Sequence, residues 1–132
     1  MNYLTTTRPD ISYAVNILSQ FMAKPNESHW KAAKKVLRYL KGTMNFVLLY
    51  TDKFDVQLAG FSDSDWAGNL DDRRSTTGYA FNIGSGVVSW SSKKEPTISL
   101  SSIEAEYKAM ASATCEVVWL RRILEDVGEK QT

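Results

Sequence analysis

The sequence predicts an α+β fold, with helices in the N-terminal third, an antiparallel sheet in the middle and one long helix near the C-terminal end. Three observations support this prediction. Apolar residues recur at helical spacing up to Gly42. Beyond Gly42 the apolar residues fall in short runs and alternations that are typical of strands. Helical spacing then returns over residues 101–127 and stops at Gly128.

The N-terminal third is predicted to form two helices packed as a hairpin. Thr7-Arg8-Pro9-Asp10 is typical of a helix start, because proline is tolerated in the first turn and aspartate complements the helix dipole. Asn26 or Ser28 can cap the second helix, and Gly42 is the expected stop. The apolar face expected for this second helix consists of Trp30, Ala33, Val36, Leu37 and Leu40.

The middle of the chain predicts strands over residues 46–50, 55–62, 78–83 and 87–91, with a short strand at 97–100. Gly84-Ser85-Gly86 is a turn that would join two of them into a hairpin. The long helix begins with a capping box, in which the Ser101 hydroxyl and the Glu104 carboxylate each satisfy a backbone N–H.

The composition is that of an ordinary globular chain of 132 residues, 43% apolar and 23% charged. A single cysteine, Cys115, excludes an internal disulfide and suits a reducing compartment. No apolar run approaches the length of a membrane span, and the N-terminus lacks the features of a signal peptide. These features predict a cytoplasmic or nuclear protein that is not secreted and does not associate with membranes.

The net charge of +1 hides a cluster of basic residues in the second helix. Its members fall three or four positions apart and so share one helical face: Lys31, Lys34, Lys35, Arg38 and Lys41. We call these five residues the basic stripe. Such a face can follow a phosphate backbone, and it can equally be an ordinary solvated helix surface.

Two aspartates end the second predicted strand. Asp63 shares a face of that strand with Phe61, and Asp65 shares it too if the strand continues. Strand parity therefore does not choose between the two aspartates. Both can also do no more than end a strand and start a loop.

Glu106 lies on the long helix, on a stripe with Ile103, Met110, Ala113 and Val117 that is expected to pack on the sheet. A carboxylate at the rim of a buried face is unfavourable unless a positive group meets it. That group can be a divalent metal shared with Asp63, because hard cations prefer carboxylate oxygens. It can instead be Arg73 or Arg74, which would make a structural salt bridge.

Several segments, taken in order, resemble the Pol polyprotein of copia-type retrotransposons. Phe61-Ser62-Asp63-Ser64-Asp65-Trp66 resembles the first strand of the ribonuclease H domain of that family. Ser101-Ser102-Ile103-Glu104-Ala105-Glu106 resembles its first helix. The other segments with this resemblance are residues 3–11, 36–43, 73–79, 89–94 and 119–122. The resemblance implies that residues 1–45 form a helical, thumb-like connection after the reverse transcriptase, and that residues 46–132 form the first part of a ribonuclease H-like domain.

The resemblance also implies a chemistry. Ribonuclease H domains of this kind hydrolyse the RNA strand of an RNA–DNA hybrid with two magnesium ions held roughly 4 Å apart by acidic side chains. Asp63 matches the aspartate of the first strand and Glu106 matches the glutamate of the first helix, so both are expected to be catalytic metal ligands. The basic stripe, Arg73 and Arg74 are the residues expected to contact nucleic acid.

The chain departs from the family pattern at its end. In the family a fourth strand carries the third metal-binding aspartate and a fourth acidic residue follows, whereas this sequence stops at Thr132. We therefore expect weak or absent Mg²⁺ binding and no meaningful hydrolysis by this chain alone, which leaves open whether it acts as an enzyme. The first strand would have an open edge, available to a second copy or to a strand-donating partner. The alternative function is a non-catalytic module, derived from the retrotransposon, that binds nucleic acid or protein.

Overall fold

The computed structural model describes residues 1–51, 56–68 and 73–131. The chain divides into two compact units, Met1–Val47 and Leu48–Thr132, which we call the helical unit and the sheet unit. The described residues form three α-helices and one three-stranded antiparallel sheet, which confirms the predicted α+β class. The identity of these units with the domains of the family remains a prediction.

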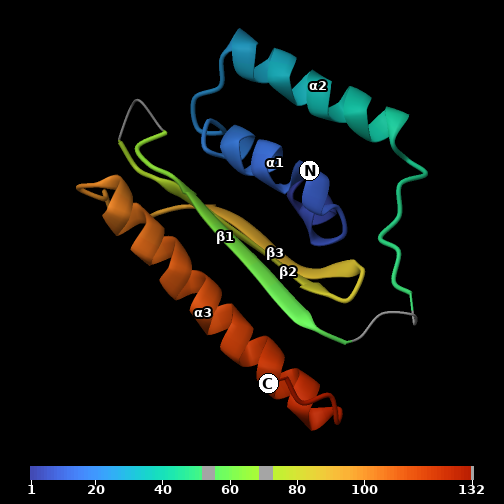
Figure 1. The fold of residues 1–132 in the computed structure, drawn as a ribbon. Helices are drawn as coiled ribbons and strands as arrows, with labels where there is room; N and C mark the ends of the chain where they lie inside the picture. The colour runs from blue at the N-terminus through green and yellow to red at the C-terminus, as the bar shows by residue number, and fades with distance from the viewer. Residues whose placement is uncertain (52–55, 69–72, 132) are drawn as a thin grey trace. The chain divides into compact units, whose positions relative to one another are not determined.

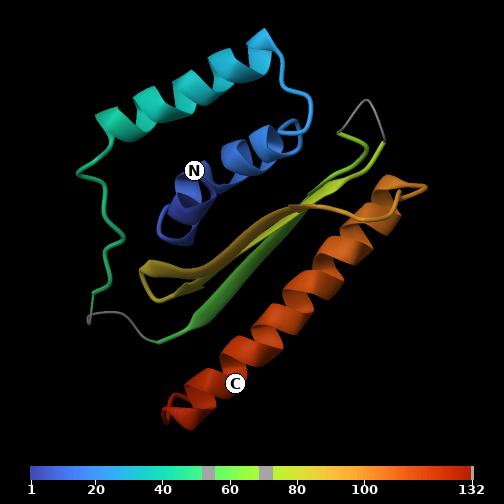
Figure 2. The same cartoon turned by 180° about the vertical axis from the view of Figure 1, so that it is seen from behind.

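The helical unit contains two 3₁₀ turns, η1 (Asn2–Thr6) and η2 (Pro9–Ile11), followed by α1 (Ser12–Ser19) and α2 (Glu27–Gly42). Figure 2 shows α1 and α2 side by side, joined by a short loop. Asn26 caps α2, because its side chain accepts a hydrogen bond from the His29 N–H at 3.0 Å. His29 Nδ1 in turn accepts from the Asn26 N–H at 3.2 Å. Two of the predicted boundaries, Asn26 and Gly42, are thus confirmed.

The predicted apolar face of α2 is only partly covered. No residue of α2 is buried, and Trp30 and Leu37 are 58% and 47% exposed. Ala33, Val36 and Leu40 are half-buried. The 16-residue α2 lies beside α1, which has only 8 residues and therefore covers a narrow stripe of it.

A polar cluster joins the start of the helical unit to the end of α2. The Arg8 guanidinium binds the Asp10 carboxylate through Nη2 at 2.7 Å and Nε at 3.0 Å. The same guanidinium donates to the Thr43 carbonyl at 3.2 Å, and the Tyr39 hydroxyl donates to Asp10 at 2.8 Å. The paired Arg8 lowers the pKa of Asp10 to about 2. Asp10 therefore does more than complement a helix dipole, since it connects η2 to α2.

The sheet unit contains β1 (Leu58–Asp65), β2 (Thr76–Ile83) and β3 (Gly86–Lys94) in the order β1-β2-β3, all antiparallel. The predicted hairpin between β2 and β3 is confirmed. Its turn contains Gly84 at φ +55°, a left-handed conformation that glycine adopts without strain.

The predicted strand at residues 46–50 is wrong, because this segment is not paired in a sheet. The residues at the end of this segment instead form hydrogen bonds with the β2–β3 hairpin at its turn. The Tyr50 hydroxyl donates to the Val87 carbonyl at 2.7 Å, and the Thr51 N–H donates to Ser85 Oγ at 3.2 Å. A Cβ on Gly86 would lie 2.3 Å from the Tyr50 ring, so this glycine makes room for the tyrosine.

The predicted short strand at residues 97–100 is also absent. Side chains instead form hydrogen bonds with backbone groups that would be paired in a strand. Trp66 Nε1 donates to the Ser99 carbonyl at 3.1 Å, and Lys108 Nζ donates to the Ile98 carbonyl at 3.4 Å.

Helix α3 (Ser102–Asp126) confirms the long helix, and its two ends follow local signals. Ser101 Oγ accepts from the Glu104 N–H at 3.1 Å, but Glu104 Oε2 accepts from the Leu100 N–H at 2.7 Å, one residue earlier than in a capping box. At the other end the Glu129 N–H donates to the Leu124 carbonyl at 2.8 Å, with Gly128 at φ +91°. This is a Schellman termination, and it turns the chain back along the helix.

Helix α3 packs over β1 and β2 in the view of Figure 1. Its buried residues are Ala105, Ala109, Leu120 and Leu124. The stripe predicted to face the sheet is therefore displaced: Ile103 and Met110 are 67% and 54% exposed. The small alanines let the helix approach the sheet closely, and this shifts the larger side chains of the predicted stripe to its flank.

Candidate functional site

The face of β1 that carries the aspartates is set by the register of the sheet. Ser89 Oγ donates to Glu116 of α3 at 2.5 Å, so Ser89 lies on the face that α3 covers. Ser89 pairs with Phe81, and Phe81 pairs with Gly60. Alternation along β1 then directs Ser62 toward α3 and directs Phe61, Asp63 and Asp65 to the opposite face.

Asp63 is exposed on that opposite face. Its Oδ1 accepts the Ser64 N–H at 2.8 Å, and its cross-strand neighbour is Gly78, which has no side chain to crowd the carboxylate. β1 does continue to Asp65, so the two aspartates share a face. The Asp65 carboxylate, however, lies against the loop backbone, where a Cβ on Gly68 would be 2.3 Å from Asp65 Oδ2.

The two glutamates at the start of α3 have different surroundings. Glu104 forms an ion pair with Lys108 at 2.9 Å, and the hydrogen bond from Lys108 lowers the pKa of Glu104. Glu106 is exposed and has no ion pair or hydrogen bond within residues 1–51, 56–68 and 73–131, including to Arg73 or Arg74. Glu104 is thus occupied in holding the helix start, whereas the Glu106 carboxylate is available.

Asp63 and Glu106 belong to the same end of the sheet unit. β1 ends where α3 begins, and the Trp66–Ser99 hydrogen bond connects the two regions. Carboxylate oxygens are the donors that magnesium prefers. The donors are nevertheless too few for a metal pair, because the part of the chain that the structure describes brings no three His, Cys, Asp or Glu side chains together. Asp63 and Glu106 are therefore of the chemical type that magnesium binds, but they are too few for a metal pair. Because Asp63 is directed to the face of β1 opposite α3, the described structure does not bring the two carboxylates together.

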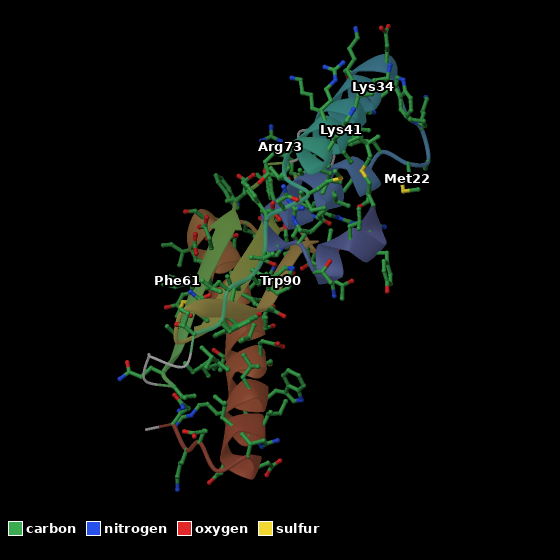
Figure 3. The ribbon with its side chains drawn as sticks, turned by 90° about the vertical axis from the view of Figure 1, so that its right-hand side faces the viewer. Met22, Lys34, Lys41, Phe61, Arg73 and Trp90 are labelled. Atoms are coloured by element: carbon green, nitrogen blue, oxygen red, sulfur yellow. The ribbon has the colours of Figure 1, made fainter. Side chains whose placement is uncertain are left out.

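The basic stripe lies on α2, and all five of its side chains are exposed. Lys31 forms an ion pair with Glu27 at 2.9 Å, one turn earlier in the helix. Lys34 Nζ lies 5.2 Å from the centre of the Trp30 ring, a cation–π contact on an exposed surface. Figure 3 labels Lys34 and Lys41 on α2.

Arg73 and Arg74, the other two basic residues expected to contact nucleic acid, precede β2 in the sheet unit. Arg73 is exposed and has φ +55°, which is unusual for a residue with a side chain. The basic residues predicted to contact nucleic acid are thus divided between the two units.

Sequence reasoning missed an apolar hollow of about 510 Å³ in the helical unit. Its lining includes Tyr3, Leu18, Met22 and Trp30. The signal in the sequence is the large apolar character of these four residues, of which only Trp30 is predicted above to lie on the apolar face of a helix. Tyr3 and Met22 are 88% and 72% exposed.

Among the residues that the structure describes, none of the helices is both long enough and apolar enough to span a membrane. The cytoplasmic or nuclear location stays a prediction.

Comparison with known proteins finds clear relatives. The chain is 46% identical over 132 residues to a retrovirus-related Pol polyprotein from transposon RE1 of Arabidopsis thaliana, and 42% identical over 131 residues to that from transposon TNT 1-94 of Nicotiana tabacum. These matches cover 100% and 99% of the chain but only 9% and 10% of the polyproteins. No protein-family model and no solved structure matches the chain.

A further relative, named secreted RxLR effector protein 161 of Plasmopara viticola, is 50% identical over 120 residues. That match covers 91% of this chain and 84% of the effector. The effector and the polyproteins thus share one sequence region, which in the polyproteins is a small part of the whole. The chain belongs to the family of retrovirus-related Pol polyproteins from copia-type retrotransposons.

Proposed function

We propose that the sheet unit acts as the N-terminal part of a ribonuclease H-like domain that hydrolyses the RNA strand of RNA–DNA hybrids. The observation that carries this proposal is the pair of exposed carboxylates at one end of the sheet unit, Asp63 at the end of β1 and Glu106 at the start of α3. The neighbouring acids are engaged elsewhere. Asp65 packs against a loop, and Glu104 forms an ion pair with Lys108. The similarity to Pol polyproteins supports the same assignment.

When bound, a magnesium pair would activate the attacking water and stabilise the leaving oxygen. Asp63 and Glu106 would hold part of that metal site through their carboxylate oxygens. Arg73 and the basic stripe would bind phosphates of the substrate. Two carboxylates supply fewer oxygens than two magnesium ions require, so we further propose that the 132-residue chain by itself cleaves hybrids little or not at all.

The test combines a cleavage assay with a magnesium titration. A labelled RNA–DNA hybrid is incubated with the chain and Mg²⁺, and amide chemical shifts of the chain are followed as Mg²⁺ is added. We expect no cleavage, and weak magnesium-induced shifts around Asp63 and Glu106. Asp63→Asn and Glu106→Gln should remove these shifts, whereas the matched variants Asp65→Asn and Glu104→Gln should retain them.

Each alternative outcome has a definite meaning. Cleavage by the wild-type chain that both Asp63→Asn and Glu106→Gln abolish would overturn the proposed inactivity but support the site. Shifts that persist in both variants would overturn the assignment of these carboxylates.

The basic stripe favours a second candidate function, nucleic-acid binding without catalysis. The specific observation is the exposed Trp30 ring beside Lys34, because a ring on which a base can stack then lies next to cations that can bind phosphate. Neither feature depends on a metal.

Binding to a fluorescent RNA–DNA hybrid, measured by anisotropy between 50 and 200 mM salt, tests this function. Each neutralised member of the stripe, such as Lys35→Gln or Arg38→Gln, should weaken binding and reduce the salt slope by roughly 1. Lys130→Gln, outside the stripe, serves as the control and should change neither. Binding that does not depend on salt would count against this function.

A further inference from the structure

A polar hollow of about 310 Å³ lies between α3 and the end of the β2–β3 hairpin that is farther from its turn. Its lining comes from three segments, namely residues 77–79 of β2, Ser91 and residues 93–96 at and after the end of β3, and Ala109 and Ser112 of α3. The volume falls at the lower end of the range for small-molecule sites. The three segments thus enclose a space that one small polar ligand can fill.

Small side chains keep this hollow open. Alternation along β2 and β3 directs Thr77, Ser91 and Lys93 to the face of the sheet that α3 covers. On the helix, Ala109 is 1% exposed but too short to fill the space, and Ser112 is the next lining residue. An apolar cavity can stay dry, whereas a polar one holds water or a ligand. The lining of this hollow is of the second kind.

Two opposite charges line this hollow without pairing with each other. The Lys93 ammonium has no hydrogen bond or ion pair in the part of the chain that the structure describes. Within the same residues, the Glu95 carboxylate accepts only the Thr77 hydroxyl, at 2.7 Å between Thr77 Oγ1 and Glu95 Oε1. Thr77 is buried, so this hydrogen bond holds the carboxylate beside the inner part of the lining. Both charged groups therefore remain available to a ligand.

The helix adds a hydroxyl donor to the same lining. A serine inside a helix commonly donates to the carbonyl four residues earlier. Ser112 forms no such bond, and its hydroxyl has no partner among residues 1–51, 56–68 and 73–131. Lys94 lines the hollow as well, so positive charge exceeds negative charge there. The lining thus offers an ammonium and a hydroxyl as donors, and one carboxylate as an acceptor.

We propose that this hollow binds a small phosphorylated sugar, with the phosphate at Lys93 and Ser112 and a sugar hydroxyl at Glu95. Phosphate oxygens accept hydrogen bonds from an ammonium and a hydroxyl at the same time. A carboxylate only accepts, so Glu95 selects a ligand whose other end donates. A simple cation would meet the lysines, and an anion without a hydroxyl would bring like charge to Glu95. The excess of positive charge favours a sugar phosphate over a neutral zwitterion.

The hollow is separate from the proposed metal site. Asp63 is directed to the face of β1 opposite α3, whereas the hollow lies on the face that α3 covers. Neither Asp63 nor Glu106 belongs to its lining. Binding in the hollow therefore needs no magnesium, and it can be tested independently of the proposed hydrolysis.

A titration of the 132-residue chain with ribose 5-phosphate, followed by amide chemical shifts in magnesium-free buffer, tests the proposal. We expect saturable shifts at the lining residues of the hollow, in β2, in α3 and around the end of β3. Inorganic phosphate and ribose should each bind more weakly by about tenfold or more, because each engages only one end of the site.

Four variants separate the two ends of the site. Lys93→Gln should weaken binding of ribose 5-phosphate by about tenfold, whereas Lys93→Arg keeps the charge and should retain most of the affinity. Glu95→Gln keeps an oxygen for the Thr77 hydroxyl, so it should weaken ribose 5-phosphate yet strengthen inorganic phosphate, which no longer meets a like charge. Ser112→Leu, at an exposed helix position, should fill the hollow and abolish binding. Lys130→Gln, outside the hollow, is the control and should change nothing.

Circular dichroism and urea denaturation show that each variant is folded before it is titrated. The absence of saturable shifts in the wild-type chain would overturn the proposal. Shifts that persist unchanged in both Lys93→Gln and Ser112→Leu would overturn the assignment of the site. Equal affinity for ribose 5-phosphate and inorganic phosphate would overturn the ligand class, because Glu95 would then contribute nothing to recognition.

Discussion

The helical unit and the sheet unit place their apolar side chains differently. In the sheet unit, Phe81 and four residues of α3 are buried between helix and sheet. In the helical unit, the buried apolar residues are Ile11 and Val15, and α2 buries none. The bidentate Arg8–Asp10 pair, bonded to Tyr39 and Thr43, connects the start of this unit to the end of α2. The sheet unit thus has the larger apolar core, while the helical unit combines a small one with a polar cluster and leaves a basic and apolar surface exposed. Mutations in the two units should therefore have effects of different size and different pH dependence.

The largest expected effect tests the core of the sheet unit. Phe81 is 4% exposed and lies 5.5 Å from the Tyr79 ring, so Phe81→Ala should destabilise the sheet unit by about 3–4 kcal/mol. Phe61→Ala on the neighbouring strand is the matched control, with a cost of less than about 1 kcal/mol. Hydrogen exchange, measured on peptides from each unit, reports the stability of the sheet unit and of the helical unit separately. Equal losses for Phe81→Ala and Phe61→Ala would contradict the proposed core.

An intermediate effect is expected from the polar cluster of the helical unit. Since the folded pKa of Asp10 is about 2, below its ordinary value of 3.8, the ionised carboxylate stabilises the fold above about pH 4, and this stabilisation is lost as the pH falls through about 2. The pair is partly exposed, so Asp10→Asn should cost about 1 kcal/mol at pH 7. Urea titrations between pH 7 and pH 2, followed by amide spectra of the helical unit, test this. The cost should shrink at low pH, and Asp63→Asn should not affect this unit; a cost independent of pH would refute the account.

The smallest effect is expected at the basic stripe. Glu27 and Lys31 form a largely exposed ion pair, so Glu27→Gln should change the stability by less than about 0.5 kcal/mol. It removes a negative charge beside the stripe and should strengthen salt-dependent binding of nucleic acid. Denaturation and anisotropy on the same sample measure both quantities. A large loss of stability would mean that α2 depends on its surface charges more than the structure indicates.

The sequence predicts the two proposed catalytic residues, Asp63 and Glu106, for different reasons. Asp63 and Glu106 came from a strand end and a helix stripe, together with the resemblance to copia-type Pol proteins. The stripe itself was displaced from the buried face of α3, so burial of Glu106 was a poor reason for choosing it. The ion pair of Glu104 with Lys108 gives a better one, because it leaves Glu106 as the unpaired carboxylate.

The sequence alone determined the features that depend on a few neighbouring residues. Asn26 begins α2, Gly84 makes the hairpin turn and Gly128 ends α3, since each supplies a backbone conformation or a capping group that its own segment needs. Only the tertiary structure decided the features that depend on distant partners. Residues 46–50 do not form a strand, because Tyr50 meets Gly86 and Val87. Gln131 pairs with β1 because the end of α3 returns the chain to a strand about 75 residues earlier. Local conformational preference is encoded in adjacent residues, whereas burial and strand pairing depend on which segments meet.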